Sequence, residues 1–464
     1  MADRFDAVFL GGGMGGYVGA IRAAQLGLRT AVVEEDKLGG CCLHRGCIPT
    51  KALLQSAFVL DQARQGERLG VRVSGVELDW AQAGRNRDQV VSQMHRGVEF
   101  LMKKNRIEVL RGRGRLDGPR RLTVSGGQGG DLEIEAQSVV VATGSRPKQL
   151  PGAASDGRAI LTSDDALMLD RIPRSAIVLG AGAVGVEFAS LWRSCGSEVT
   201  VVEMLDRLVP LEDRAVGVEL AKHFEARGIR CLVGARLDLG SVSRDEGGVE
   251  VTVAREGKEE RLRAEVLLVA VGRAPVSEDI GLESTAAEVD RGFIRAGGDQ
   301  GTAEPGVYAV GDVAGGFLLA HKGSHEGIIA AEAIAGLRPH PLNPNLVPRT
   351  TYCTPQIASM GLSEEEARAA GHQVRVATFP LTANGRSVIW GERGFCKLVA
   401  GADDSVLGVH IIGAEVTELI YAASLGGLLE ATPFEMGRAM APHPTVSEIL
   451  MEAALAASGQ AIHI

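Results

Sequence analysis

The sequence has no long hydrophobic run, few aromatic residues and no excess of basic charge. Its longest apolar stretches, such as residues 267–271, have the length of a strand, whereas a membrane-spanning helix needs about 18 residues. Aromatic residues make up 4% of the chain, and 58 acidic residues outweigh 49 basic ones to give a net charge of −9. Such a chain offers neither base-stacking surfaces nor a basic face, so we expect no nucleic-acid or membrane partner.

Cysteine is also scarce, with seven residues in 464. An odd and unevenly spaced set argues against the disulfide framework of a secreted protein, so we expect a cytoplasmic protein. Three of the seven, Cys41, Cys42 and Cys47, nevertheless lie within one short segment. The clustering of the cysteines is therefore more informative than their number.

Two segments share the pattern of a nucleotide-binding βαβ unit. A short apolar strand, a glycine-rich turn, a helix and a second strand ending in glutamate occupy residues 7–34 and recur at 176–203. The first two glycines of such a turn let the backbone approach a pyrophosphate at the helix N-terminus, and the third allows close helix–strand contact. These glycines are Gly11, Gly13 and Gly16 in the first copy and Gly180, Gly182 and Gly185 in the second.

Each second strand ends in an acid, Glu34 or Glu203, that is placed to accept hydrogen bonds from ribose hydroxyls. A carboxylate there repels a 2′-phosphate, so Glu203 favours NAD over NADP, although Arg207 follows closely and opposes that preference. Two dinucleotides in one chain imply electron transfer between them, most simply between NAD and FAD.

Cys42 and Cys47 are five residues apart, and in a regular helix their side chains would diverge by roughly 140°. Gly46 permits a break at which the two sulfurs meet. Pro49 suits the first position of a helix, which places Cys47 at a helix N-terminus where the dipole and Lys51 stabilise a thiolate.

Two other interpretations of this segment are buried structural cysteines and a zinc site that includes His44. No second Cys-x-x-Cys pair follows in the chain. A redox disulfide is therefore favoured, and we expect no metal.

The pattern Gly-x-Cys-x4-Cys-Ile-Pro-Thr-Lys over residues 40–51, between two dinucleotide modules, resembles the pyridine nucleotide–disulfide oxidoreductases. Within them the chain is most similar, over nearly its whole length, to the dihydrolipoamide dehydrogenases. Further matching stretches are residues 142–147, 271–275, 308–313, 319–322 and 443–448.

The resemblance implies an α/β fold with two Rossmann-like dinucleotide-binding domains, for FAD and NAD, and a C-terminal α+β dimerisation domain. We expect the FAD-binding domain in residues 1–148 and 275–345, the NAD-binding domain in 149–274 and the dimerisation (interface) domain in 346–464. The resemblance also implies a homodimer.

The resemblance further implies oxidation of dihydrolipoamide by NAD⁺ through FAD and a Cys42–Cys47 disulfide. The substrate is dihydrolipoamide, free or on a lipoyl domain of a 2-oxo acid dehydrogenase or glycine cleavage complex. His443, held by Glu448, is the expected base and reaches the cysteines of the other subunit. The implied FAD contacts, besides the turn glycines, are Glu34, Lys51, Gly114, Thr143, Gly144, Ser145, Asp312, Leu319, Ala320 and His321. Those for NAD are Glu187, which also pairs with Lys51, together with Glu203 and Gly272.

Other members of the family are alternatives, as is a silent dinucleotide-binding protein. A glutathione reductase needs NADPH and basic residues after the second strand, against which Glu203 argues. A mercuric reductase needs a C-terminal vicinal cysteine pair, and residues 460–464 contain none. A catalytically silent protein needs neither the cysteine pair nor His443 and Glu448, and this chain has all four.

Three departures from the family pattern bear on the site. Cys41 stands where the family has threonine, and we expect it to be a packed, unreactive thiol. His44 and Arg45 add charge beside the disulfide. Residues 315–316 and 323–325, which include three glycines, are expected to make the flavin-facing loop and the helix start less regular than is typical.

Overall fold

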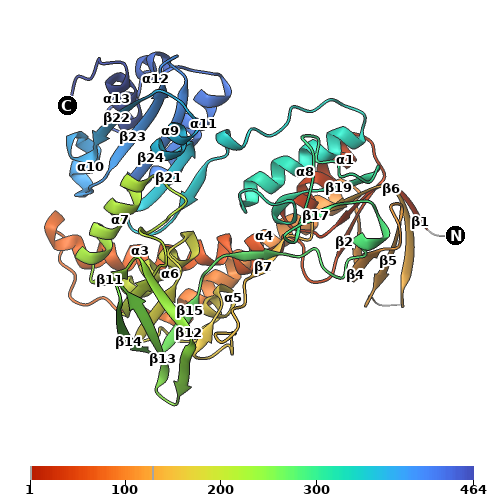
Figure 1. Ribbon diagram of the computed structural model, residues 1–464, viewed down its shortest axis with the longest axis horizontal. Coiled ribbons are helices and arrows are strands. Elements are labelled where there is room, and N and C mark those ends of the chain that lie inside the picture. The colour runs from red at the N-terminus through yellow and green to blue at the C-terminus, as the bar shows by residue number, and fades with distance from the viewer. Residues whose placement is uncertain (1–2, 128–129) are drawn as a thin grey trace. The chain divides into compact units, whose positions relative to one another are not determined.

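The computed structural model describes residues 3–127 and 130–464, and the chain divides into two compact units. Unit 1 takes the chain up to Ala52, Ala81–Lys148 and Arg273–Leu342, and unit 2 takes Leu53–Trp80, Gln149–Gly272 and Asn343–Ile464. Figure 1 follows the chain through both units by colour. Among the described residues, no helix combines the length and apolar character required to span a bilayer.

Unit 1 is built on a seven-stranded sheet in the order β3-β2-β1-β6-β5-β4, with β19 beside β6. The parallel strands are β1 (Asp3–Leu10), β2 (Thr30–Glu34), β3 (Glu108–Arg111), β6 (Leu132–Val141) and β19 (Val307–Ala309). β4 (Arg113–Leu116) and β5 (Arg121–Ser125) extend β6 as an antiparallel meander. The alternating pattern of residues 107–142 predicts antiparallel strands. This is confirmed for β4 with β5 and for β5 with β6, and is wrong for β3, which pairs parallel with β2.

Both faces of this sheet are covered. Successive side chains of a strand point to opposite faces, so Val8 and Phe9 of β1 enter two different apolar clusters. Apart from two longer helices that pack together, the remaining elements of unit 1 are α2 (Gly40–Arg45), the start of α3 (Cys47–Gln65), most of α4 (Trp80–Lys104), β7 (Ser145–Pro147) with β16 (Arg273–Pro275), and β17 (Val289–Asp290) with β18 (Phe293–Ile294).

Helices α1 (Met14–Gln25) and α8 (Ala320–Ile334) lie side by side and approach through glycines (Figure 1). A Cβ added to Gly327 would lie 2.3 Å from the carbonyl oxygen of Gly15. Gly323 likewise faces Gly311, and α8 is continuous through it. The expectation of an irregular helix start was therefore wrong, because this glycine serves close packing and does not break the helix.

Unit 2 contains the second module, whose five-stranded parallel sheet has the order β11-β10-β9-β15-β8. Its elements are β8 (Ile160–Leu161), α5 (Ser163–Leu167), β9 (Ser175–Leu179), α6 (Ala183–Ser194), β10 (Glu198–Val202), α7 (Arg214–Ala226), β11 (Ile229–Leu232) and β15 (Val266–Val269). A three-stranded antiparallel meander packs with it through a shared apolar cluster. Its strands are β12 (Ala235–Asp245), β13 (Gly248–Arg255) and β14 (Lys258–Ala264).

The C-terminal part of unit 2 is an antiparallel sheet in the order β20-β21-β24-β23-β22. Its strands are β20 (Arg349–Thr351), β21 (Gln356–Gly361), β22 (Val374–Pro380), β23 (Phe395–Gly401) and β24 (Val406–Gly413). The helices are α9 (Glu364–Ala369), α10 (Gly385–Trp390), α11 (Val416–Leu428), α12 (Pro433–Arg438) and α13 (Glu448–Ala457). The last boundary between the units falls at 342/343, within a proline-rich stretch over residues 338–348 that the sequence indicates as a linker.

A buried ion pair joins the second module to this C-terminal part. Asp213 caps α7 by accepting from the backbone of Ala215, and both of its oxygens lie 2.9 Å from Nζ of Lys397 on β23. The side chains of Asp213 and Lys397 are 1% and 8% exposed. Burial alone raises the pKa of Asp213, but the hydrogen bonds from Lys397 and from the backbone of Glu364 hold it below the ordinary value.

Replacing Lys397 by Met should lower the free energy of unfolding by about 3 kcal/mol, because it leaves a buried carboxylate without its cation. The lowered pKa means that the ionised carboxylate contributes stability above about pH 4, which is lost as the pH falls through the folded-state value. Urea unfolding of the two proteins at pH 7 and at about pH 2.5 measures this difference, which should shrink at the lower pH.

The matched control is Lys222→Met, because Lys222 forms an exposed ion pair with Glu219. That change should cost less than about 1 kcal/mol. Equal effects of the two substitutions would contradict a structural role of the buried pair.

Candidate active site

In the first glycine-rich turn, the fold requires glycine at two positions, whereas the middle glycine borders open space. Gly11 has φ +109°, and a Cβ there would lie 2.4 Å from the oxygen of Ala142. A Cβ on Gly16 would lie 1.8 Å from the oxygen of Gly11. At Gly13, the N-cap of α1, the nearest atom is 3.9 Å away. The middle glycine therefore leaves room for a ligand at the positive end of the helix.

The second turn repeats this arrangement. Gly180 has φ +101°, and its Cβ would lie 2.6 Å from the oxygen of Ala270. A Cβ on Gly185 would lie 1.9 Å from the oxygen of Gly180, whereas at Gly182 no atom lies within 4 Å. Two turns with the same open position fit two pyrophosphates.

The acid that ends each second strand is fixed against its own turn. Oε2 of Glu34 accepts from the backbone nitrogen of Gly12 at 2.7 Å, and Oε2 of Glu203 accepts from that of Ala181 at 2.7 Å. The other oxygen of each acid accepts a backbone N–H two residues further along the chain. These bonds orient the carboxylates, and each oxygen retains a lone pair for a ribose hydroxyl.

Cys42 and Cys47 form a disulfide with their Cα atoms 4.7 Å apart. Cys42 lies in α2, Gly46 interrupts the helical path, and α3 begins at Cys47. A Cβ on Gly46 would lie 3.3 Å from Cα of Cys42, so glycine allows the close return of the chain. Pro49 is the third residue of α3 and not the first as expected. The first turn tolerates proline there because a backbone N–H at that position would have no partner within the helix.

Helix α2, which carries Cys42, starts directly against the first glycine-rich turn. The backbone nitrogen of Gly39 donates to the oxygen of Gly12 at 2.8 Å. A Cβ on Gly40 would lie 2.6 Å from Cα of Gly13. The disulfide is therefore anchored at the open position where a dinucleotide fits.

Arg273 joins three residues of unit 1, a role that the sequence analysis missed. Its Nη2 lies 3.1 Å from Sγ of Cys41, and its Nε donates to Oγ of Ser145 at 2.7 Å. Ser145 in turn donates to Asp312. The stretch 271–275 matches the family pattern, but only the contact in the structure shows that its arginine reaches the cysteine segment.

The other residues predicted to bind the cofactors take varied positions. Thr143 and Gly144 form hydrogen bonds with the backbone of Val276. Gly114 lies so close to Leu10 and Val33 that a Cβ on it would be 2.4 Å from the Leu10 side chain. Leu319 caps α8, so Ala320 and His321 form its first turn. Gly272 has φ +105°. Their predicted roles stay predictions.

His443 and Glu448 meet as the sequence pattern predicts. Nδ1 of His443 lies 2.8 Å from Oε1 of Glu448, the first residue of α13, and the backbone nitrogen of Thr445 donates to the other oxygen at 3.0 Å. Burial raises the pKa of Glu448, but these two hydrogen bonds hold it below the ordinary value. The histidine side chain is 78% exposed. Asn384, which the sequence analysis missed, fixes the loop by donating to the oxygen of Thr445 at 3.0 Å.

Glu187 is buried on α6 and accepts from the backbone nitrogen of Tyr352 at 2.9 Å. It belongs to unit 2, whereas Lys51, on α3, belongs to unit 1. Their pairing stays a prediction.

His44, the possible zinc ligand of the sequence analysis, contacts the backbone of Leu38. Its Nε2 lies 2.9 Å from the oxygen of Leu38, which Nδ1 of His95 also meets at 3.0 Å. Burial lowers the pKa of His44, with a smaller contribution from the neighbouring His95. In residues 3–127 and 130–464, no three His, Cys, Asp or Glu side chains are grouped to hold a metal ion.

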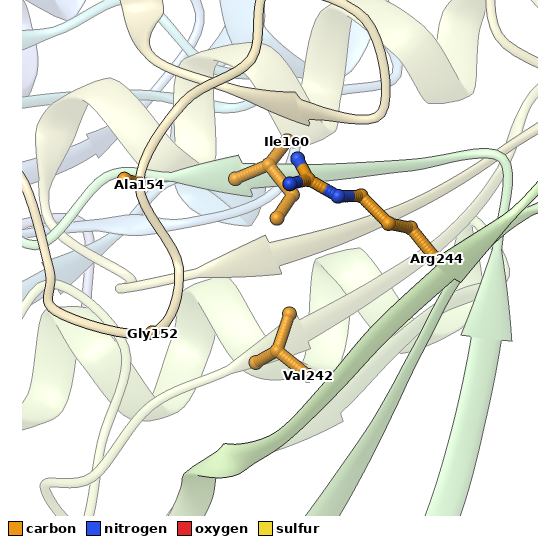
Figure 2. A pocket seen from close by; sticks show the side chains of 5 residues that line it. All are labelled: Gly152, Ala154, Ile160, Val242 and Arg244. Carbon is orange, nitrogen blue, oxygen red and sulfur yellow. The ribbon is translucent and has the colours of Figure 1, made fainter.

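A hollow of about 250 Å³ lies elsewhere in unit 2, lined by Gly152, Ala154, Ile160, Val242 and Arg244 (Figure 2). Arg244, its one charged lining residue, pairs with Asp156. The hollow includes none of the predicted site residues.

Comparison with known proteins agrees with this geometry. The family model for pyridine nucleotide-disulphide oxidoreductases matches residues 5–327, and the model for the dimerisation domain of the same family matches residues 347–454. The chain is 46% identical to dihydrolipoyl dehydrogenase of Bacillus subtilis (strain 168) and 43% identical to that of Zymomonas mobilis, over the whole of each chain.

Among solved structures, LpdA from Mycobacterium tuberculosis is similar with a TM-score of 0.89 and 29% identity, over 98% of this chain and 99% of that one. The HOCl-induced flavoprotein disulfide reductase RclA from Escherichia coli, in its Cu(II) complex, is similar with a TM-score of 0.85 and 25% identity, over 97% and 99%. The two turns, the disulfide and the two family matches lead to one conclusion: the chain belongs to the pyridine nucleotide-disulphide oxidoreductases.

Proposed function

We propose that this chain is an FAD-containing dihydrolipoyl dehydrogenase, which oxidises dihydrolipoamide with NAD⁺. The observation that carries this proposal is the Cys42–Cys47 disulfide, whose helix starts against the first glycine-rich turn in a chain that holds a second such turn. The full-length relatives named dihydrolipoyl dehydrogenase support the choice of substrate.

FAD fits the first module and NAD the second. The space at Gly13, the N-terminus of α1 and Glu34 would hold FAD, together with Thr143, Gly144, Ser145, Asp312 and the first turn of α8. The space at Gly182, Glu203 and Gly272 would hold NAD. Bound FAD supplies a carrier that takes two electrons from a dithiol and delivers them to NAD⁺ as hydride.

The disulfide takes these two electrons from the substrate. A substrate thiolate attacks Sγ of Cys42, a new S–S bond forms, and Cys47 leaves as a thiolate at the N-terminus of α3, where the helix dipole stabilises it. The second substrate sulfur, as thiolate, then attacks the first substrate sulfur and releases Cys42. The substrate leaves as a cyclic disulfide, and both cysteines are reduced.

His443 removes the proton of the attacking substrate thiol. Its exposed ring is available to a substrate, while Glu448 fixes the orientation and tautomer of the imidazole through Nδ1. That hydrogen bond leaves Nε2 as the proton acceptor.

The working molecule is a homodimer in which His443 of one subunit serves the disulfide of the other. Helix α11 and its C-cap present an exposed apolar row with the spacing of one helix face. It is formed by Tyr421, Leu425 and Leu428 on the helix and by the C-cap Leu429. This row lies in the part matched by the dimerisation-domain model and suits a symmetric contact between two copies.

The domain limits that we propose are 1–148 with 275–345 for FAD, 149–274 for NAD and 346–464 for the dimer. The substrate is dihydrolipoamide, free or carried on a lipoyl domain of a larger complex. Five of the seven cysteines are not disulfide-bonded, which suits the reducing cytoplasm.

Alanine at Gly13 and at Gly182 tests the two cofactor assignments separately. The open space at both positions means that the fold should be kept. Gly13→Ala should lose most of its bound FAD, whereas Gly182→Ala should keep FAD and raise the KM for NAD⁺ about tenfold, equivalent to about 1.4 kcal/mol. Flavin absorbance, circular dichroism and steady-state kinetics measure these effects. Each variant is the control of the other, and full flavin in the first would refute the assignment.

Serine substitutions test the disulfide itself. A Cys47 thiolate beside oxidised flavin gives a long-wavelength charge-transfer band, so Cys42→Ser should show this band without reductant and Cys47→Ser should not show it. Both variants should lose turnover with dihydrolipoamide. The control is Cys41→Thr, which should stay within a few-fold of the parent because a hydroxyl oxygen still accepts from Arg273. Loss of turnover in this control would mean that the working pair is misassigned.

A further inference from the structure

The segment after β10 is tied at both ends to the second glycine-rich turn. Ala181 donates its backbone N–H to Glu203 at 2.7 Å and accepts at its carbonyl from the backbone nitrogen of Val209 at 2.9 Å. Arg207 lies between these two attachments. Its side-chain stem packs on α7, where a Cβ on Gly217 would lie 3.5 Å from Cβ of Arg207. Arg207 therefore has a defined place, in a segment that is fixed at both ends to the second glycine-rich turn.

Arg207 and Arg214 are both held by the same two acids. Arg214 lies 2.7 Å from Glu365 and 2.6 Å from Asp206. Arg207 lies 3.1 Å from Glu365 and 3.4 Å from Asp206. Two cations and two anions thus form a closed network in which neither guanidinium carries an uncompensated charge.

Glu365 enters this network from outside the second module. It lies on α9, whose first turn is fixed by a capping box between Ser363 and Glu366. The Arg207 side chain is only 18% exposed, and its Nε is buried without a hydrogen-bond partner among the described residues. Its cationic tip is therefore satisfied mainly by Glu365 and Asp206, at its Nη atoms.

An arginine near the end of this strand is the usual partner of the 2′-phosphate of NADP, and an acid is the usual partner of the 2′-hydroxyl of NAD. The chain carries both residue types here. We propose that Glu365 is a specificity-determining residue: by neutralising Arg207 and Arg214 it withholds both cations from a 2′-phosphate and keeps the site selective for NAD. This inference rests on the proposed assignment of the second module to NAD.

The charge balance makes the proposal testable. Glu365→Gln keeps the shape of the side chain and leaves two arginines with one aspartate, so the network gains one positive charge. Because the network is partly exposed, the effect should be moderate and should decrease with salt. The four side chains are not part of the proposed thiol chemistry.

The direct readout is calorimetric binding of adenosine 2′,5′-bisphosphate and of AMP to the full-length holoenzyme. Glu365→Gln should tighten binding of the bisphosphate about fivefold at low salt and leave AMP unchanged. The ratio of NADP⁺ to NAD⁺ in kcat/KM should rise by the same factor. Replacing both Arg207 and Arg214 by Gln in the same protein should remove the gain.

The matched control is Glu260→Gln, which removes one acid from the exposed Arg230–Glu260 pair elsewhere in the module. This substitution should leave the affinities for both the bisphosphate and AMP unchanged. An unchanged bisphosphate affinity in Glu365→Gln, or an equal gain in the control, would overturn the proposal.

The same experiment separates the inference from the proposed function. If AMP does not bind the parent protein, the nucleotide assignment of the second module is wrong and the inference falls with it. If the ligands bind as expected but dihydrolipoamide does not reduce NAD⁺, the proposed reaction is wrong and the inference stands.

Discussion

The close approach of backbone to backbone at the first glycine-rich turn is the constraint on which the rest of unit 1 depends. Gly16 sits on the carbonyl of Gly11, α8 lies against α1 through Gly15 and Gly327, and Gly40 lies on Gly13. Any side chain at these contacts would separate elements that now touch. The same compact turn therefore provides a phosphate-sized space and the attachment point of α2, the helix that carries Cys42.

Unit 2 uses the same turn for a different purpose. Its middle glycine is equally open, but no cysteine segment comes after it, and the segment after β10 instead returns to Ala181 and carries a network of charges. One backbone device thus supports thiol chemistry in one module and nucleotide selection in the other. The two modules differ in the segment that the chain adds after the second strand.

Local sequence patterns were enough to predict the parts of the fold that depend on local geometry. The two βαβ modules follow from glycine spacing, and the break at Gly46 follows from the need to bring Cys42 and Cys47 together. The start of α3 was misplaced by two residues because proline is tolerated throughout a first helical turn. The effect of Gly323 was predicted wrongly because the glycine is required by close contact with Gly311, which lies outside the helix of Gly323.

The contacts that the sequence did not predict all join distant segments. Arg273 reaches Cys41, Tyr352 holds Glu187, and Glu365 holds Arg207, in each case across more than a hundred residues. No periodicity or spacing reports such contacts, since they depend on how the strands and helices pack. The roles of the cofactor-binding residues likewise come from resemblance and fit and stay predictions.

In the proposed reaction, the Cys42–Cys47 disulfide passes electrons from dihydrolipoamide to NAD⁺. The most direct measurement is anaerobic NADH formation by the flavin-loaded protein with dihydrolipoamide, compared with glutathione at equal thiol concentration. We expect rapid NADH formation with dihydrolipoamide and none with glutathione. Rapid formation with glutathione, or none with dihydrolipoamide from fully flavinylated protein, would contradict the proposed reaction.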